Sequence, residues 1–200
     1  MRSQMQPAHL DRRRGGSAVA MLRRATNDAH RRLERELGLM SSELTLDGYC
    51  ALLVGFAAVH RTLDDELAGQ LEDAGSDEAL VELDIGSRRR TPALAEDLDR
   101  LGVPQPAPVA FPLTSRAGAL GALYVSEGAT LGGLVIAPHV RAVLGPDAPV
   151  AFFAGGVDVV ARWATCRRVI DRLLVTPGDR QEAATVATAL FDRFGEVVRR

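Results

Sequence analysis

Apolar residues recur every three or four positions along most of the chain, which is the spacing of one buried face of an α-helix. The first stripe predicts a helix over about residues 19–37, and Gly38 is placed to end it. A second, longer stripe follows Thr45, whose hydroxyl suits an N-cap. That helix is expected to end before Gly69 or Gly75.

Proline marks helix starts and loops in the rest of the chain. Thr91-Pro92 and Thr176-Pro177 each combine an N-cap with a proline that suits the first helical position, so they predict a short helix and the last helix. The segments 103–112, which has four prolines, and 146–156 are predicted to be loops. A penultimate helix is predicted over about residues 157–175.

The fold class that these stripes predict is all-α, because no segment alternates between apolar and polar residues over the length of a strand. We expect one compact domain of about six to eight helices over residues 17–200. Residues 1–16 are polar and lack periodicity, so they predict a flexible lead-in.

Composition and charge limit the classes of partner that the protein is expected to bind and the compartment in which it is expected to lie. The 200 residues are 46% hydrophobic and 25% charged, and the formal net charge of -2 gives no general reason to bind nucleic acid or a membrane surface. Cys50 and Cys166 lie far apart in helical patterns, so buried thiols are expected. With no apolar run of roughly 18 residues and no signal-peptide pattern, we expect the cytoplasm.

The helix that opens at Thr114 or Ser115, and that Pro138 is expected to end or kink, contains an unusual number of glycines. Gly128, Gly132 and Gly133 together give up about 3 kcal/mol of helix stability relative to alanine. The spacing of Gly121, Val125, Gly128 and Gly132 predicts one bare helical face. Either a closely crossing helix or a bound ligand could explain that face.

The first helix contains a second unusual face. Arg23, His30 and Glu34 lie along one of its sides, and Arg23 is about 10 Å from His30 along the helix axis. Glu34 is placed to contact the imidazole and fix its tautomer. A solvated helix face is the alternative. For His60 and His139, with no carboxylate or second ligand recognised at metal spacing, a structural role is expected.

A histidine face and a glycine face on two helices could together hold a flat ligand, with the imidazole on a metal and the glycines against the opposite side. Haem is the natural candidate, because histidine is a common axial ligand of haem iron.

Two motifs resemble those of a known family, the bacterial haem oxygenases, and in particular the biliverdin-producing type found beside bacteriophytochromes. The segment LRRATNDAHRRLE, residues 22–34, is similar to the proximal helix of that family. The segment LYVSEGATLGG, residues 123–133, is similar to its distal helix. The likeness runs from about residue 20 to the C-terminus. It implies a haem-oxygenase-like fold with haem between a proximal helix and a kinked, glycine-rich distal helix.

The resemblance assigns roles to individual residues. It implies that His30 is the proximal iron ligand, with Glu34 as its partner, and that Gly128 and Gly132 form the distal wall. Arg23 matches a basic position that faces a haem propionate.

Arg167, on the penultimate helix, matches a second propionate-facing position of the family, although a solvated helix charge is the alternative. One position departs from the mammalian-type motif, in which an aspartate directly after the first distal glycine organises proton delivery. This chain has Ala129 there, so Thr130, the nearest hydroxyl, or ordered water would have to serve.

The resemblance implies oxygen-dependent cleavage of haem, both substrate and cofactor, to biliverdin, carbon monoxide and ferrous iron. It also implies an external ferredoxin or flavoprotein as electron donor and a bacteriophytochrome as a candidate acceptor of biliverdin. Two alternatives stay open. One is a haem-binding carrier or sensor without turnover, and the other is a helical protein whose glycines serve only helix crossing.

Overall fold

The computed structural model describes residues 16–72, 77–156 and 158–199, so residues 1–15 of the predicted lead-in lie outside the described residues. Within these ranges the chain forms eight α-helices and one 3₁₀-helix, which confirms the predicted all-α class. The helices are α1 (Ala18–Leu37), α2 (Leu46–Leu71), α3 (Glu78–Val81), the 3₁₀-helix η1 (Ile85–Arg88), α4 (Thr91–Arg100), α5 (Arg116–Leu144), α6 (Ala151–Ala154), α7 (Val159–Leu173) and α8 (Pro177–Val198).

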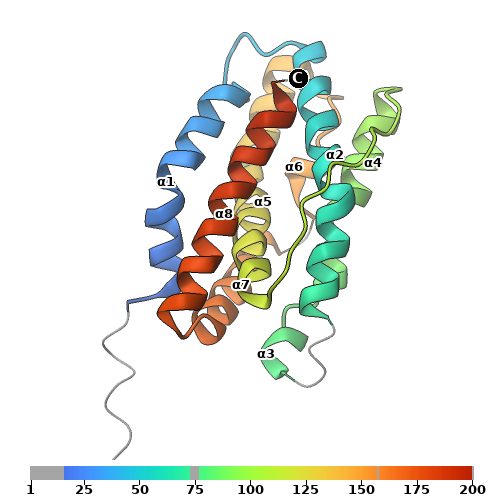
Figure 1. Ribbon diagram of the computed structural model, residues 1–200. Coiled ribbons are helices and arrows are strands. Elements are labelled where there is room, and N and C mark those ends of the chain that lie inside the picture. The colour runs from blue at the N-terminus through green and yellow to red at the C-terminus, as the bar shows by residue number, and fades with distance from the viewer. Residues whose placement is uncertain (1–15, 73–76, 157, 200) are drawn as a thin grey trace, which may run out of the picture.

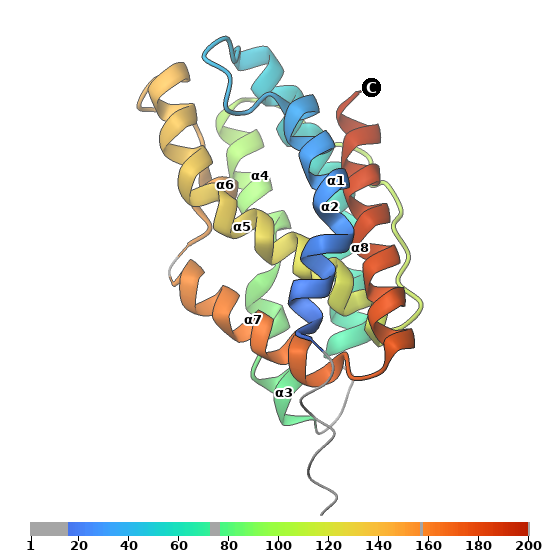
Figure 2. The ribbon, with the colours of Figure 1, turned by 90° about the vertical axis from the view of Figure 1, so that its left-hand side faces the viewer.

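The long helices form a bundle in which α8 stands between α1 and α2, with α5 running obliquely behind it (Figure 1). Helix α1 packs on α8 and, near its start, on α7, whereas α5 packs on α8, α6, α7 and α2. Figure 2 shows α1 passing in front of the middle of α5, with α7 below. Helices α1 and α5 are thus joined mainly through their neighbours, and this arrangement leaves room between them.

Local capping signals set several helix ends where the sequence predicts them. Thr45 accepts a hydrogen bond from the Gly48 amide at the start of α2. Thr176 and Asp179 form a reciprocal capping box at the start of α8. Gly38 ends α1 in the left-handed region, with φ 57°, where glycine has no steric penalty.

The short helix α6 lies in a segment predicted to be a loop. Its first amides are bound by a distant carboxylate: the Ala151 and Phe152 amides donate to the two oxygens of Asp97 at 2.7 and 2.8 Å. Asp97 belongs to α4 and is fully buried. A cap more than fifty residues away leaves no local signal, and the sequence pattern therefore missed this helix.

Helix α5 continues through Pro138 to Leu144, so the proline, which was expected to end or kink the helix, does not end it. By length and hydropathy α5 could cross a membrane, but 56% of its most apolar window is buried inside the protein, as in a core helix. Cys166 is buried, as predicted, and burial raises the pKa of its thiol to about 12. Cys50 is half-buried, and both cysteines are free.

Candidate functional site

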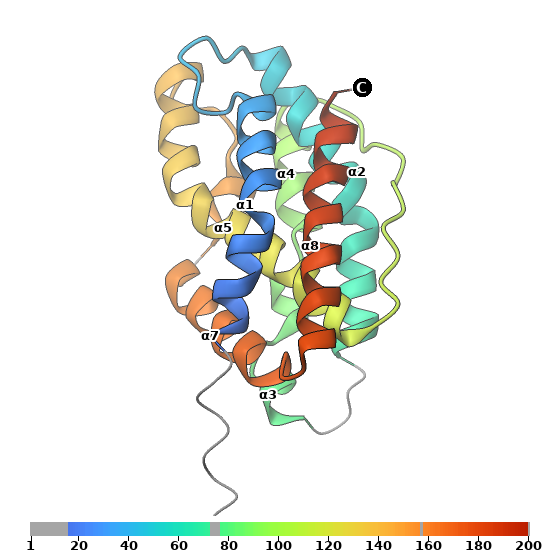
Figure 3. The same ribbon diagram turned by 60° about the vertical axis from the view of Figure 1, so that its left-hand side comes forward.

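A cavity of about 650 Å³ opens between α1 and α5, within the size range of small-molecule and cofactor sites. Side chains of α2, α6, α7 and α8 complete its wall. In Figure 3, α1 lies in front of α5, with α7 below them and α8 and α2 to the right. The cavity brings together all the predicted binding residues: Arg23, His30, Glu34, Gly128, Gly132 and Arg167.

Helix α1 presents the predicted histidine face to this cavity. The His30 side chain is 52% exposed, and its Nδ1 lies 3.4 Å from Oε2 of Glu34, one turn further along the helix. The Phe191 ring of α8 packs edge-on against the imidazole, with ring centroids 5.4 Å apart. With Nδ1 directed at Glu34, the other ring nitrogen is left for a ligand.

The glycines of α5 serve two different purposes, which corrects the prediction of a single bare face. A Cβ added at Gly121 would collide with the backbone of Ala183 in α8, and one at Gly133 with the backbone of Phe153 in α6. These two glycines allow close backbone contact. Added Cβ atoms at Gly128 and Gly132 would meet nothing within 4 Å, and both residues line the cavity.

The two predicted arginine anchors lie at the same end of the cavity. At the start of α1, the Val19 amide donates to Oδ1 of Asp171 in α7, over 3.0 Å. Arg23 is one turn after Val19, and Arg167 is one turn before Asp171. Both arginines are exposed and line the cavity, so their guanidinium groups can pair with carboxylates of a ligand at this end.

The fold matches solved haem oxygenases. The NO- and CO-bound haem oxygenase of Neisseria meningitidis aligns with this chain with a TM-score of 0.77 at 20% identity, covering 92% of both chains. Haem oxygenase-1 of the cyanobacterium Synechocystis, solved in complex with haem, aligns with a TM-score of 0.73 at 16% identity, covering 92% of this chain and 91% of that one. The chain has the haem oxygenase fold.

The relation extends to sequence. A protein named haem oxygenase from Xanthomonas campestris pv. campestris is 39% identical over 108 residues, which are 54% of this chain and 66% of that protein. The match thus spans slightly less than two thirds of the relative's length. No family model matches the chain. The predicted resemblance to bacterial haem oxygenases is confirmed by these similarities.

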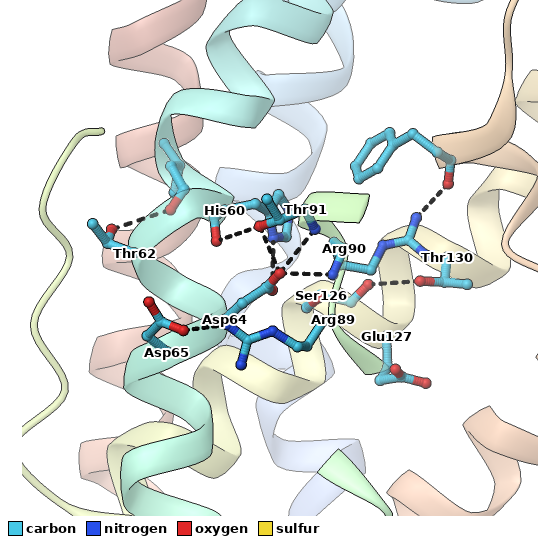
Figure 4. A network of polar contacts seen from close by, with 12 residues as sticks. His60, Thr62, Asp64, Asp65, Arg89, Arg90, Thr91, Ser126, Glu127 and Thr130 are labelled. Atoms are coloured by element: carbon cyan, nitrogen blue, oxygen red, sulfur yellow. Dashed lines mark hydrogen bonds and ion pairs between the residues drawn. The ribbon is translucent and has the colours of Figure 1, made fainter. Parts of the chain in front are cut away.

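Within this haem oxygenase fold, Thr130 does not occupy the place predicted for it. Its side chain is 1% exposed, and its hydroxyl donates to the carbonyl oxygen of Ser126 at 3.1 Å, one turn back in α5 (Figure 4). Ser126 lines the cavity, but Thr130 does not. The predicted hydroxyl donor therefore points away from the cavity, because the helix period turns it to the packed side of α5.

Sequence reasoning missed a buried ion-pair cluster directly before the cavity glycines. Glu127 is 1% exposed, and its carboxylate pairs with Arg88 at 2.6 Å and with Arg162 at 3.3 Å. These arginines come from η1 and α7. Removing one partner of a buried pair is strongly destabilising, so this cluster ties three elements together beside Gly128. The only sequence signal is a glutamate within an apolar stretch.

A second missed feature is the partner of His60, which was expected to have no carboxylate nearby. The structure corrects this: Oδ1 of Asp64, one turn further along α2, lies 3.7 Å from Nδ1 of His60. Both side chains are 2% exposed, and His60 belongs to the cavity wall. The spacing is the same as that of His30 and Glu34, so the pair could have been found from the sequence.

Proposed function

We propose that this protein is a haem oxygenase: it binds haem and, with dioxygen and electrons from another protein, cleaves it to biliverdin, carbon monoxide and ferrous iron. The observation that carries this proposal is the placement of His30 and the glycines Gly128 and Gly132 in the walls of one cavity between α1 and α5. The fold and the sequence relation to haem oxygenases support it.

The residues present fit haem in three respects. Imidazole is a common axial ligand of haem iron, and His30 is directed to the cavity by Glu34. The open space beside Gly128 and Gly132 lets a flat ring approach the backbone of α5. Arg23 and Arg167 can hold the propionate carboxylates at one end.

Each part of the cavity then has its own task. Haem, when bound, supplies the iron that activates oxygen and the ring that is cleaved. His30 would hold the iron, Glu34 would hold the imidazole tautomer, and the two arginines would pair with the propionates and so orient the ring. Gly128 and Gly132 form the distal wall and leave room for dioxygen on that side.

The reaction requires partners that the chain itself does not supply. We propose that a ferredoxin or a flavoprotein donates the electrons in the cytoplasm, and that a bacteriophytochrome is the acceptor of the biliverdin.

Adding ferric haem to the purified protein tests the proposal. We expect a histidine-ligated absorption spectrum, and, with reductant and oxygen, the appearance of biliverdin absorbance and carbon monoxide. A haem complex that stays intact under these conditions would instead indicate a carrier or sensor. Absence of haem binding would overturn the proposal and indicate that the open space beside Gly128 and Gly132 takes another ligand or none.

A further inference from the structure

The inner part of the cavity wall contains a titratable pair in apolar surroundings. The His60 ring lies 5.6 Å from the ring of Phe152 in α6 and 5.5 Å from that of Phe194 in α8, measured between centroids. Both phenylalanines line the same cavity. Burying an imidazole among phenyl rings is unfavourable unless its polar atoms are satisfied.

The carboxylate beside it is held firmly from the opposite side (Figure 4). Oδ2 of Asp64 accepts hydrogen bonds from the amides of Arg90 and Thr91, both at 2.8 Å, and from the Thr91 hydroxyl at 2.7 Å. These donors belong to the start of α4. They fix the carboxylate and leave its other oxygen directed at His60.

His60 itself is incompletely satisfied. Its Nδ1 is buried and has no hydrogen-bond partner among the described residues. The 3.7 Å gap to Asp64 exceeds hydrogen-bond length but closes with a small rotation. A buried polar atom without a partner is rare in native proteins and needs an explanation, and His60 also faces a cavity that takes a ligand.

The charges around the ring favour one protonation state. Burial lowers the pKa of His60, Asp64 opposes this, and the Arg90 guanidinium adds to it. That guanidinium lies over the Phe152 ring at 4.5 Å, while α8 contributes the Phe194 ring on the remaining side. Burial alone would raise the pKa of Asp64. The contacts with His60 and Thr91 lower that pKa by more, so it lies below its usual value.

A neutral imidazole beside an ionised carboxylate places its proton on Nδ1, toward Asp64. Its Nε2, at the opposite edge of the ring from Asp64, is then a hydrogen-bond acceptor, and the residue lines the cavity. An acceptor there binds one hydrogen of a water molecule and leaves the second hydrogen directed into the cavity. Ala129 offers only a methyl group, and Thr130 points away, so neither residue after Gly128 can do this.

We propose that His60, positioned by Asp64, anchors the water that delivers protons on the inner side of the haem cavity. This inference rests on the proposed function, because it concerns the same reaction. His60 is a positioning residue in this scheme: it orients water and does not itself bind iron.

The test uses His60→Gln and Asp64→Asn, compared with His139→Gln as a matched control. In Asp64→Asn the side-chain amide oxygen still accepts from the Arg90 and Thr91 amides, which protects the fold. His139 lies outside the cavity wall, next to the carbonyl of Ser41. Circular dichroism and haem titration should show folded proteins that bind haem as the wild type does.

Two readouts are then compared with the wild type. We expect the pH midpoint of the visible spectrum of the ferric haem complex to move by about half a pH unit or more in both variants, because the water near the iron loses its anchor. Biliverdin formation should slow by about tenfold or more. The control should change neither.

The outcomes separate the two proposals. A wild-type protein that does not bind or cleave haem overturns the proposed function. A wild type that cleaves haem, together with cavity variants that keep its pH midpoint and its rate, overturns the role of His60 and Asp64 alone. A change in His60→Gln without one in Asp64→Asn overturns the part of the inference that makes Asp64 the positioning partner.

Discussion

Two histidine–carboxylate pairs with the same spacing lie on neighbouring parts of one cavity, and their surroundings differ completely. His30 and Glu34 are 52% and 63% exposed on α1, whereas His60 and Asp64 are each 2% exposed on α2. The first imidazole is open to a ligand, and the second is enclosed by aromatic rings. A four-residue spacing on a helix therefore determines only that the imidazole and the carboxylate lie next to each other. Burial decides whether the pair can bind a large ligand or can only orient a small one.

The largest expected effect is on the exposed pair. His30→Ala should remove the histidine-ligated spectrum of the haem complex and reduce biliverdin formation to background, because it removes the proposed ligand of the iron. Absorption spectra after haem addition measure this, with His139→Ala as the control. A variant with an unchanged spectrum would show that His30 does not ligate the iron.

Next in size is the difference between the two carboxylates. Asp64→Ala leaves the Arg90 and Thr91 amides without their acceptor, whereas the Thr91 hydroxyl can still donate to the His60 carbonyl, and it should lower the free energy of unfolding by about 3 kcal/mol. Glu34→Ala, at an exposed position, should change it by no more than about 0.5 kcal/mol. Urea denaturation of the haem-free proteins compares them. Equal losses would contradict the assignment of one structural and one ligand-facing carboxylate.

A smaller effect concerns pH. Because burial lowers the pKa of His60 in the folded state, the unfolded chain takes up a proton there first as the pH falls below about 6.5. The contribution of a neutral His60 to the free energy of unfolding is therefore complete above about pH 6.5. It is lost as the pH falls toward the lowered pKa of His60 in the folded state. His60→Gln should reduce the loss between pH 6.5 and 5.5 by about 1 kcal/mol. Thermal unfolding across this range measures it, and identical pH profiles would contradict the buried, neutral state.

The smallest expected change lies on the wall opposite His30. Gly128→Ala should raise the free energy of unfolding by up to about 1 kcal/mol, since an added Cβ meets no other atom and alanine favours the helix. The same methyl group would project into the cavity and should weaken haem binding. An added Cβ at Gly69 in α2 also meets nothing within 4 Å, so Gly69→Ala should stabilise the protein by a similar amount without changing its affinity for haem. Unchanged haem affinity in Gly128→Ala would show that Gly128 does not lie against the bound haem.

Local signals were sufficient for the long helices and for the histidine face. Thr45, Thr176 and Gly38 act within a few residues of themselves, so their effect can be predicted from the sequence. The binding residues predicted from the two motifs line one cavity because helix periodicity already places them on two faces.

What the sequence could not supply depends on contacts between distant segments. The first amide of α6 is bound by a carboxylate of α4. Whether a glycine of α5 contacts a neighbouring backbone or faces the cavity depends on which element lies opposite it. Helix periodicity already places Thr130 on the side of α5 away from Gly128 and Gly132. Thr130 was nevertheless predicted as a proton donor because it is the hydroxyl nearest to Gly128 in the sequence. His60 was passed over because its burial, which gives the Asp64 spacing its meaning, is a property of the assembled bundle.

The short helix α6 depends on Asp97 of α4 for the hydrogen bonds of its first amides. Four residues are too few to form a stable helix alone, so α6 can form only when α4 is in place to bind its first amides. Phe152 and Phe153, which α6 carries, are part of the cavity wall. The aromatic part of the cavity wall therefore depends on Asp97, a buried carboxylate that does not itself line the cavity.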